Sequence, residues 1–200
     1  MRKLPLLGLT MFILCLSACS NLMVDKTTAT DSPVPSNKGL ATLDKWQLRG
    51  KLGIRSATKG TSANLQWYQN KRNYQLKLSG PLGTGTAIAE GDSNSIEVKQ
   101  GSKTYRGTPQ AIGQQLIGLP IPVDVISWWA RGLPSPNVPP ATDTHTDLDG
   151  KFQRFNQAGW QLSFSNYTSV QGYHLPTKLS GQSGDLGFKL IVSSWRITHD

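Results

Sequence analysis

The 200-residue sequence has little cysteine and little acid. Its two cysteines, Cys15 and Cys19, both lie in the first 19 residues, so a domain built from the rest of the chain has no disulfide and no cysteine-ligated metal. Aspartate and glutamate number 12 against 21 lysines and arginines, which gives a formal net charge of +9. Such a basic chain fits a nucleic acid, an anionic membrane surface or an acidic protein surface, and composition does not separate these three.

Motifs of common catalytic and nucleotide-binding sites are also absent. The sequence contains no GxxxxGK[ST] loop, no GxSxG elbow and no HExxH pair. Its three histidines, His145, His174 and His199, are scattered and are expected to be solvated. The stretch "HTDLDG" resembles the start of a calcium loop, but it begins with histidine and has Asn156 where that loop needs glutamate. We therefore expect no enzyme activity, no metal and no cofactor.

The start of the chain, "MRKLPLLGLTMFILCLSACS", predicts a secretory signal peptide over residues 1–18. Two basic residues precede an apolar run from Leu4 to Leu16, which is too short to span a bilayer, and small residues follow it. Residues 16–19, Leu-Ser-Ala-Cys, match the lipobox of bacterial lipoproteins, in which cleavage precedes the cysteine that carries the lipid. Lipidation is therefore predicted at Cys19.

Cys15 is the weaker alternative, since the bulky Leu14 would then stand at the cleavage point. By resemblance to the lipoprotein sorting rule, Ser20 after the lipidated cysteine implies the outer membrane. Cleavage also removes two basic residues and lowers the formal charge to about +7. Because the mature protein would be lipid-anchored outside the cytoplasm, facing the periplasm, a nucleic acid is not an expected partner.

The chain after Cys19 divides into a tether and one domain. Residues 19–42 are rich in Ser, Thr, Asp, Pro and Asn and predict a flexible lipidated tether. Residues 43–200 are long enough for a single core. In "WQLRGKLGIR", residues 46–55, apolar or glycine residues alternate with polar ones, which is typical of a half-buried strand. The same period recurs in segments beginning at residues 63, 74, 96, 160 and 186, so strands dominate.

The middle of the chain departs from this period. Thr108 and Pro109 predict the start of a helix that continues through Leu116, and a second helix is expected from about Pro122 to Gly132. Residues 133–149 are interpreted as a long polar loop. A mainly β fold follows: an unclosed antiparallel β-barrel whose open side is covered by an inserted helical lid over an apolar cavity.

Several segments together resemble the LolB family of outer-membrane lipoprotein receptors. They are, in order, the lipobox, "WQLRGKLGIR", "LQWYQ", "YQLKLSGPLGTG", "LIGLPIPVDVISWWARGLPSP", "QAGWQLSFSNY" and "HLPTKL". The resemblance implies an eleven-stranded unclosed barrel of the LolA/LolB type. It also implies a receptor that accepts lipoproteins from the periplasmic carrier LolA and places them in the inner leaflet of the outer membrane, acting as a monomer.

Two sets of site residues follow. In the family, the leucine of a projecting Pro-Leu-Gly loop is needed for insertion, and this loop maps here onto Pro81, Leu82 and Gly83. From turn chemistry alone, Gly80 to Gly83 fit a type I turn, with Leu82 facing either the membrane or the barrel end. The acyl-chain cavity is predicted to include inward strand positions and a movable helix, namely Leu52, Ile54, Leu65, Trp67, Leu76, Leu78, Trp128 and Trp129.

Other interpretations stay open at this level. Six basic residues on or between the strands, Arg49, Lys51, Arg55, Lys71, Arg72 and Lys77, either attract an acidic carrier or form an ordinary solvated face. A cell-wall or polysaccharide-binding lipoprotein would instead use exposed tryptophan and tyrosine. A lipid-modifying enzyme is disfavoured, because no nucleophile and base are arranged for one.

Overall fold

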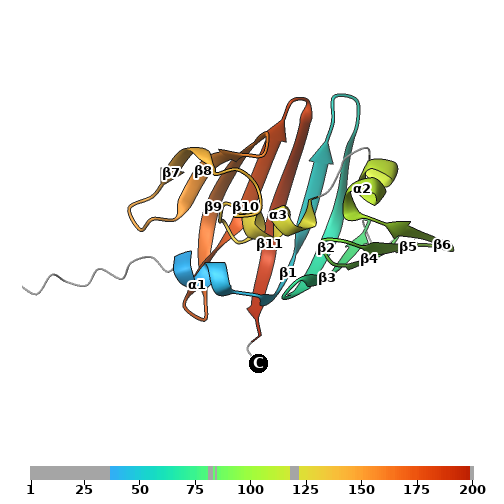
Figure 1. Cartoon of the computed structure of the whole chain (residues 1–200), viewed down its shortest axis with the longest axis horizontal. Helices are drawn as coiled ribbons and strands as arrows, with labels where there is room; N and C mark the ends of the chain where they lie inside the picture. The colour runs from blue at the N-terminus through green and yellow to red at the C-terminus, as the bar shows by residue number, and fades with distance from the viewer. Residues whose placement is uncertain (1–36, 81–82, 84, 118–121, 199–200) are drawn as a thin grey trace, which may run out of the picture. The chain divides into compact units, whose positions relative to one another are not determined.

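The computed structural model describes residues 37–80, 83, 85–117 and 122–198, all within the compact unit formed by residues 33–200 (Figure 1). The predicted signal peptide and Cys19 lie outside the described residues. Among the described residues, no helix combines the length and the apolar character needed to cross a membrane.

Eleven strands in the described part of the chain form one antiparallel sheet in the order β6-β5-β4-β3-β2-β1-β11-β10-β9-β8-β7. Every neighbouring pair is antiparallel, and the edge strands β6 and β7 are not paired with each other, so the barrel is not closed. The predicted fold class is confirmed. The strands are β1 Lys45–Arg55, β2 Gly60–Asn70, β3 Asn73–Ser79, β4 Ala87–Gly91, β5 Ile96–Gln100, β6 Lys103–Gly107, β7 Thr142–Thr146, β8 Phe152–Gln157, β9 Trp160–Val170, β10 Tyr173–Ser183 and β11 Leu186–Ile197.

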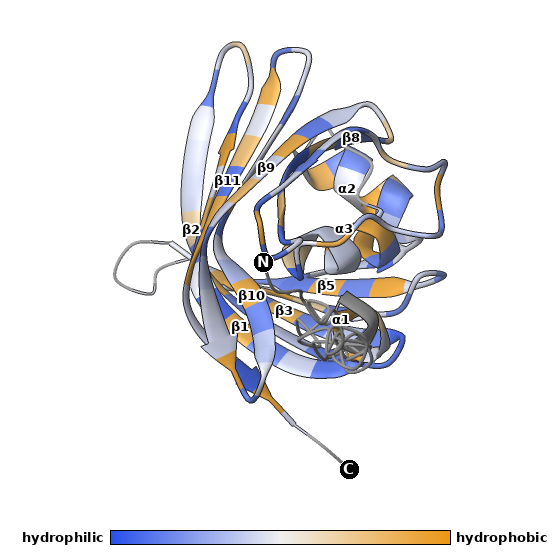
Figure 2. Ribbon diagram, turned by 90° about the vertical axis from the view of Figure 1, so that its left-hand side faces the viewer, coloured by the Kyte–Doolittle hydropathy of each residue, from blue (hydrophilic) through white to orange (hydrophobic). Residues whose placement is uncertain are grey.

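In the part of the chain that the structure describes, three helices accompany the sheet: α1 Asn37–Thr42, α2 Pro109–Ile117 and α3 Val123–Ala130. The sheet curves, and α2 and α3 lie on its concave side (Figure 2). Helix α2 begins as predicted, with the Thr108 hydroxyl accepting a hydrogen bond from the Ala111 amide at 3.2 Å. Val125 and Trp129 of α3 are buried, as expected for the apolar face of a covering helix.

A β-bulge keeps the long central strands in phase. Strand β1 pairs with β11 from Trp46 to Arg55, but the register shifts between Arg49 and Gly50, so that Ser193 is inserted in β11. Leu190 and Trp195 are five residues apart and would normally face opposite sides of the strand. Because one residue is inserted between them, both side chains lie on the buried inner face. A side chain at Gly50 would place its Cβ 2.3 Å from the Ile191 carbonyl oxygen, so only glycine fits beside the bulge.

The centre of the core is aromatic. The Trp46 ring lies 5.0 Å from that of Trp67 and 5.4 Å from that of Trp195, measured between centroids. Each of these contacts joins neighbouring strands on the concave face, and Trp46 is almost fully buried. Pairs of this kind add about 0.5–1.5 kcal/mol each beyond the burial of apolar area.

Two expectations about connecting segments were wrong. The predicted tether ends too late, because residues 37–42 form helix α1 and Leu40 is buried in the core. The segment 133–149 is not a loop throughout, since β7 lies within it and forms the exposed edge of the sheet. Both segments are polar in composition, and they gain their structure from contacts with residues distant in sequence.

Candidate functional site

The six predicted strand positions of the cavity lie on one face of the sheet. Leu52 pairs with Ala63 across β1 and β2, and Leu65 pairs with Leu78 across β2 and β3. Directly paired residues share a face, as do residues two apart in one strand. The same argument adds the other three residues, Ile54, Trp67 and Leu76, to this concave face.

This inner face is filled unevenly. Leu65 and Trp67 are buried, whereas Leu52, Leu76 and Leu78 are half-buried apolar side chains packed at the margin of the core. Ile54 is also half-buried. The small Ala87 and Ala89 stand opposite Leu78 and Leu76 on β4. The concave face therefore presents apolar surface that the protein's own side chains do not cover, which is the property an acyl-chain site needs.

The predicted tryptophans take different positions. Trp67 donates through Nε1 to Gln69 Oε1 at 2.9 Å, and Trp129 donates to Gln157 Oε1 at 2.9 Å. Both rings are buried with their polar atom satisfied, so they belong to the packed core. Trp128 is half-buried and lines a pocket at one end of the sheet.

That pocket has a volume of about 570 Å³ and mixes apolar with polar walls. It lies where β1 begins and where β2 turns into β3, beneath α1 and α3. Its lining residues are Ala41, Leu43, Asp44, Trp46, Gln69, Lys71, Arg72, Tyr74, Ser93, Val123, Asp124, Ser127, Trp128, Arg131 and Asn137. Of the eight predicted cavity residues, all of them in the described part of the chain, Trp128 alone contributes to this lining.

Two residues in the pocket wall carry unusual polar groups. Tyr74 is 5% exposed, and its Oη makes no hydrogen bond. Burial, together with the negative charges of Asp92 and Asp124, raises its pKa well above the ordinary tyrosine value. The hydroxyl is therefore a proton donor at neutral pH, with no acceptor among the described residues.

Arg131, just after α3, is also 5% exposed. Its Nε donates to the Ser127 carbonyl at 3.1 Å, and its Nη1 donates to the carbonyls of Leu40 and Leu43 at 2.7 Å each. The guanidinium lies 4.5 Å from the centroid of the Trp128 ring. Burial lowers its pKa to about 10, against which Asp44 acts weakly, so the group stays charged at neutral pH.

A third buried polar residue, Gln157 of β8, holds the segment that follows α3. It accepts from Trp129 Nε1 and from the Ser135 amide, and it donates to the carbonyls of Ser135 and Pro139 at 2.9 and 3.1 Å. One amide side chain thus joins the lid helix, its following loop and the sheet.

Pro81 and Leu82 of the predicted insertion loop lie outside the described residues, whereas Gly83 is described. Its amide donates to the Gly80 carbonyl at 3.0 Å, which is the hydrogen bond of a four-residue turn. Gly83 is exposed and has φ of +79°, a conformation that favours glycine. This turn joins β3 to β4, at the end of β3 opposite the pocket.

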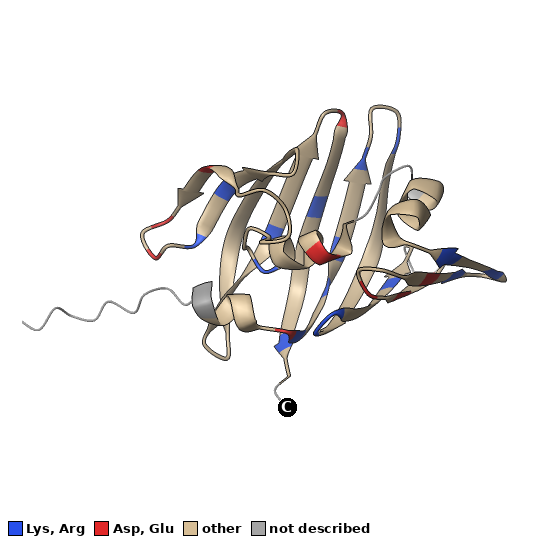
Figure 3. Cartoon of the chain, in the orientation of Figure 1, with Lys and Arg blue, Asp and Glu red and all other residues tan. Residues whose placement is uncertain are grey.

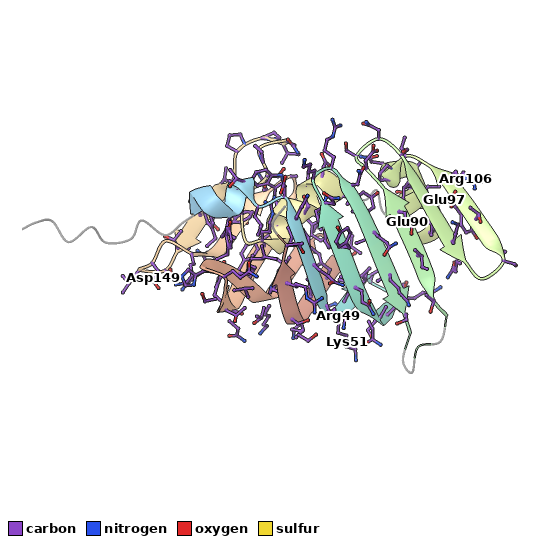
Figure 4. The ribbon with its side chains drawn as sticks, turned by 90° about the horizontal axis from the view of Figure 1, so that it is seen from below. Arg49, Lys51, Glu90, Glu97, Arg106 and Asp149 are labelled. Atoms are coloured by element: carbon purple, nitrogen blue, oxygen red, sulfur yellow. The ribbon has the colours of Figure 1, made fainter. Side chains whose placement is uncertain are left out.

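The six basic residues singled out in the sequence are exposed. Arg49 and Lys51 project from the convex side of the sheet, away from the helices (Figure 4). Acidic residues are sparse along the central strands (Figure 3). Lys71 and Arg72 differ from the others, because they also form the rim of the pocket.

Alternatives based on metal or glycan binding gain no support. Among the described residues, no group of three His, Cys, Asp or Glu side chains is placed to hold a metal ion. In "HTDLDG", Lys151 Nζ lies 3.1 Å from Asp147 Oδ2 and also contacts Asp149, so a cation of the protein occupies this loop. All six tryptophans fall in the described part of the chain and are buried or half-buried, so among the large exposed apolar side chains described there, Tyr68 is the one aromatic residue that a sugar could stack on.

The fold and the apolar concave face define the class of protein. A crystal structure of a LolA superfamily protein from Nitrosomonas europaea superposes with a TM-score of 0.53 and 9% sequence identity, over 80% of this chain and 88% of that one. At this identity the similarity concerns the fold alone. The class is thus an unclosed antiparallel β-barrel, similar in fold to that LolA superfamily protein.

The sequence comparisons are more specific. The family model described as "Outer membrane lipoprotein LolB" matches residues 44–195. Outer-membrane lipoprotein LolB of Pseudomonas paraeruginosa is 36% identical over 159 residues, which cover 78% of this chain and 77% of that protein. The protein of the same name from Pseudomonas fluorescens is 35% identical over 161 residues, with the same coverage. The chain therefore belongs to the LolB family of outer-membrane lipoproteins, as the sequence segments indicated.

Proposed function

We propose that the protein is an outer-membrane-anchored receptor that accepts lipoproteins from a LolA-like periplasmic carrier and inserts them into the membrane. The acyl chains would lie against the concave apolar face, and transfer would need neither nucleotide hydrolysis nor other catalysis. The observation that carries the proposal is the set of half-buried apolar residues Leu52, Ile54, Leu76 and Leu78 on that face. Family membership supports the role in lipoprotein localisation.

The energetics favour a sheltered route. Each methylene transferred from water to an apolar phase contributes about 0.8 kcal/mol, so exposed acyl chains would not cross an aqueous gap. A concave face that leaves part of its own apolar surface uncovered can bind chains of varied shape. A bilayer offers the same apolar environment without limiting the number of chains, so movement from protein to membrane runs downhill.

Acyl binding is tested with the domain lacking its first 32 residues. We expect it to bind an acylated peptide, and Leu78→Glu to weaken that binding at least tenfold, because a carboxylate would replace part of the apolar wall. Ile191→Glu is the matched control: Ile191 is a partly exposed apolar strand residue of β11 that pairs with Lys51 on the convex side. A domain that binds no acyl ligand, or two variants with equal effects, would contradict the proposal.

The cellular role is tested by depleting the protein and following its clients. Lipoproteins bound to the carrier should accumulate in the periplasm. Normal localisation after depletion would contradict the receptor role while leaving acyl binding intact. Anchoring is tested by producing Cys19→Ala in the depleted cells. The variant protein should be released from the outer membrane.

A further inference from the structure

The pocket beside the apolar face has polar groups that the proposed acyl-chain site does not use. Tyr74 Oη is buried without an acceptor, although buried hydroxyls are usually hydrogen-bonded. The hydrogen bonds of Arg131 use Nε and Nη1, so its Nη2 donates none to the described residues. Both residues line one pocket and have unused donor capacity, with Tyr74 Oη lying just beneath the pocket surface, which is a reason to expect a ligand with acceptor oxygens.

The charges around the pocket favour an uncharged ligand. Lys71, Arg72 and Arg131 line it together with Asp44 and Asp124. A further carboxylate, Asp92, is close enough to affect the pKa of Tyr74. Positive and negative groups therefore nearly balance, and neither an anion nor a cation gains much from the local field. Neutral carbonyl oxygens would accept hydrogen bonds from Tyr74 and Arg131 without requiring a counter-ion.

The pocket also stands in line with the apolar face. Tyr74, Leu76 and Leu78 are alternate residues of β3 and therefore point to the same side. At about 3.3 Å per residue, Tyr74 and Leu78 are separated by roughly 13 Å along the strand. One strand thus leads from a polar donor to half-buried leucines, which is the layout that a ligand with a polar head and apolar chains requires.

We propose that the pocket of Tyr74 and Arg131 receives the polar head of an acylated client, while its chains lie along Leu76 and Leu78. The head consists of the ester and amide carbonyls that join acyl chains to a lipoprotein's terminal cysteine. This inference rests on the proposed function and adds to it a site for the part of the client that is not hydrocarbon. Binding of the head fixes the direction of the client in the barrel, with the chains pointing toward the β3–β4 turn.

The test compares Tyr74→Phe with wild type, using two neutral probes. One is an acylated cysteine amide with octanoyl chains, and the other is the hydrocarbon diphenylhexatriene. The variant should bind the acylated cysteine about five- to tenfold more weakly, the effect of losing one hydrogen bond, and should bind the hydrocarbon unchanged. Removal of an unpaired hydroxyl should leave the melting temperature equal or higher. Tyr68→Phe, which removes a hydroxyl from an exposed position of β2, should behave as wild type with both probes.

Each other result has a definite meaning. Equal affinities of Tyr74→Phe and wild type for the acylated cysteine would overturn the head site, and so would a loss that is equal for both probes. Affinity for this neutral probe should change little between 50 and 500 mM salt; a steep fall would overturn recognition of an uncharged head. If wild type binds neither probe, the proposed function itself fails.

Discussion

Arg131 Nη1 donates to the Leu40 carbonyl, 91 residues earlier in the chain, across 2.7 Å. This bond and the one to Leu43 tie the end of helix α3 to helix α1, the first described segment. The Leu40 and Leu43 carbonyls at the end of α1 thereby gain a charged donor, and the buried guanidinium gains acceptors. A covering helix of the barrel is thus fastened to α1, the segment that follows the predicted tether and lipidation site.

Arg131→Met should therefore loosen both helices. The substitution keeps much of the apolar volume but removes the guanidinium hydrogen bonds to three main-chain carbonyls, at a cost of roughly 2–4 kcal/mol in the free energy of unfolding. Hydrogen exchange at Leu43 and in α3 should rise. The control is Arg106→Met, which removes an exposed cation paired with Glu97 and should cost less than about 1 kcal/mol. Equal losses of unfolding free energy in the two variants would show that the hydrogen bonds from Arg131 to the Leu40 and Leu43 carbonyls do not stabilise the domain.

The bulge in the central strands gives a second prediction. Gly50→Ala should destabilise the domain by about 1–3 kcal/mol, because the new Cβ would meet the Ile191 carbonyl at 2.3 Å. Gly53→Ala, three residues along the same strand, meets nothing closer than 3.9 Å and should be nearly neutral. Urea unfolding of the two variants measures the difference, and similar midpoints would show that β11 moves away easily.

The Pro-Leu-Gly segment gives a prediction about delivery. Leu82→Glu should leave folding and receipt of lipoproteins nearly unchanged but slow their release into liposomes, since a carboxylate does not enter an apolar phase. Leu148→Glu is the matched control, because Leu148 is a fully exposed leucine in the turn between β7 and β8. Unfolding of the Leu82 variant would instead mean that this leucine plugs the end of the barrel.

A buried tyrosine, Tyr74, and a half-buried one, Tyr167, set the response to alkali. Burial raises the pKa of Tyr74 and of Tyr167, whose Oη donates to the Phe152 carbonyl at 2.6 Å. Above about pH 10 the unfolded chain loses these protons while the folded protein keeps them. Stability is therefore complete below pH 10 and falls above it, by up to about 1.4 kcal/mol per pH unit for each tyrosine.

Tyr74→Phe should reduce this alkaline slope, measured as the unfolding free energy between pH 9 and pH 11. The matched control is Tyr68→Phe, which removes a tyrosine hydroxyl at an exposed position of β2. A slope that is the same in Tyr74→Phe and wild type would show that Tyr74 ionises normally in the folded protein.

The strands and their inner faces were predictable because one face is buried and the other solvated. Alternation around Leu52, Leu65 and Leu76 therefore marks the concave side directly. The inserted Ser193 was not predictable. A bulge shifts the alternation of inward and outward side chains by one residue, and no particular residue type marks it in the sequence. Glycine at position 50 is a hint of it, but glycine also occurs at position 53, where nothing approaches closely.

The predicted acyl-chain positions on the strands follow from alternation, but the pocket does not. Arg131 and Tyr74 look like ordinary surface and core residues in the sequence. Their roles depend on contacts over long separations, such as the 91 residues between Arg131 and Leu40. An arginine directly after an apolar helix and before glycine is the weak signal that was available, because a cation there often meets main-chain carbonyls.

The order of the strands has a consequence for how the domain forms. The earliest strand, β1, pairs with the latest, β11, and this pair joins two halves whose free edges, β6 and β7, come from the middle of the chain. Loop closure over such a separation is slow, and β1 cannot pair with β11 until residues 186–197 are available. A chain still being made would therefore carry β1 paired with β2 alone, which leaves the β11-facing edge of β1 open to other strands.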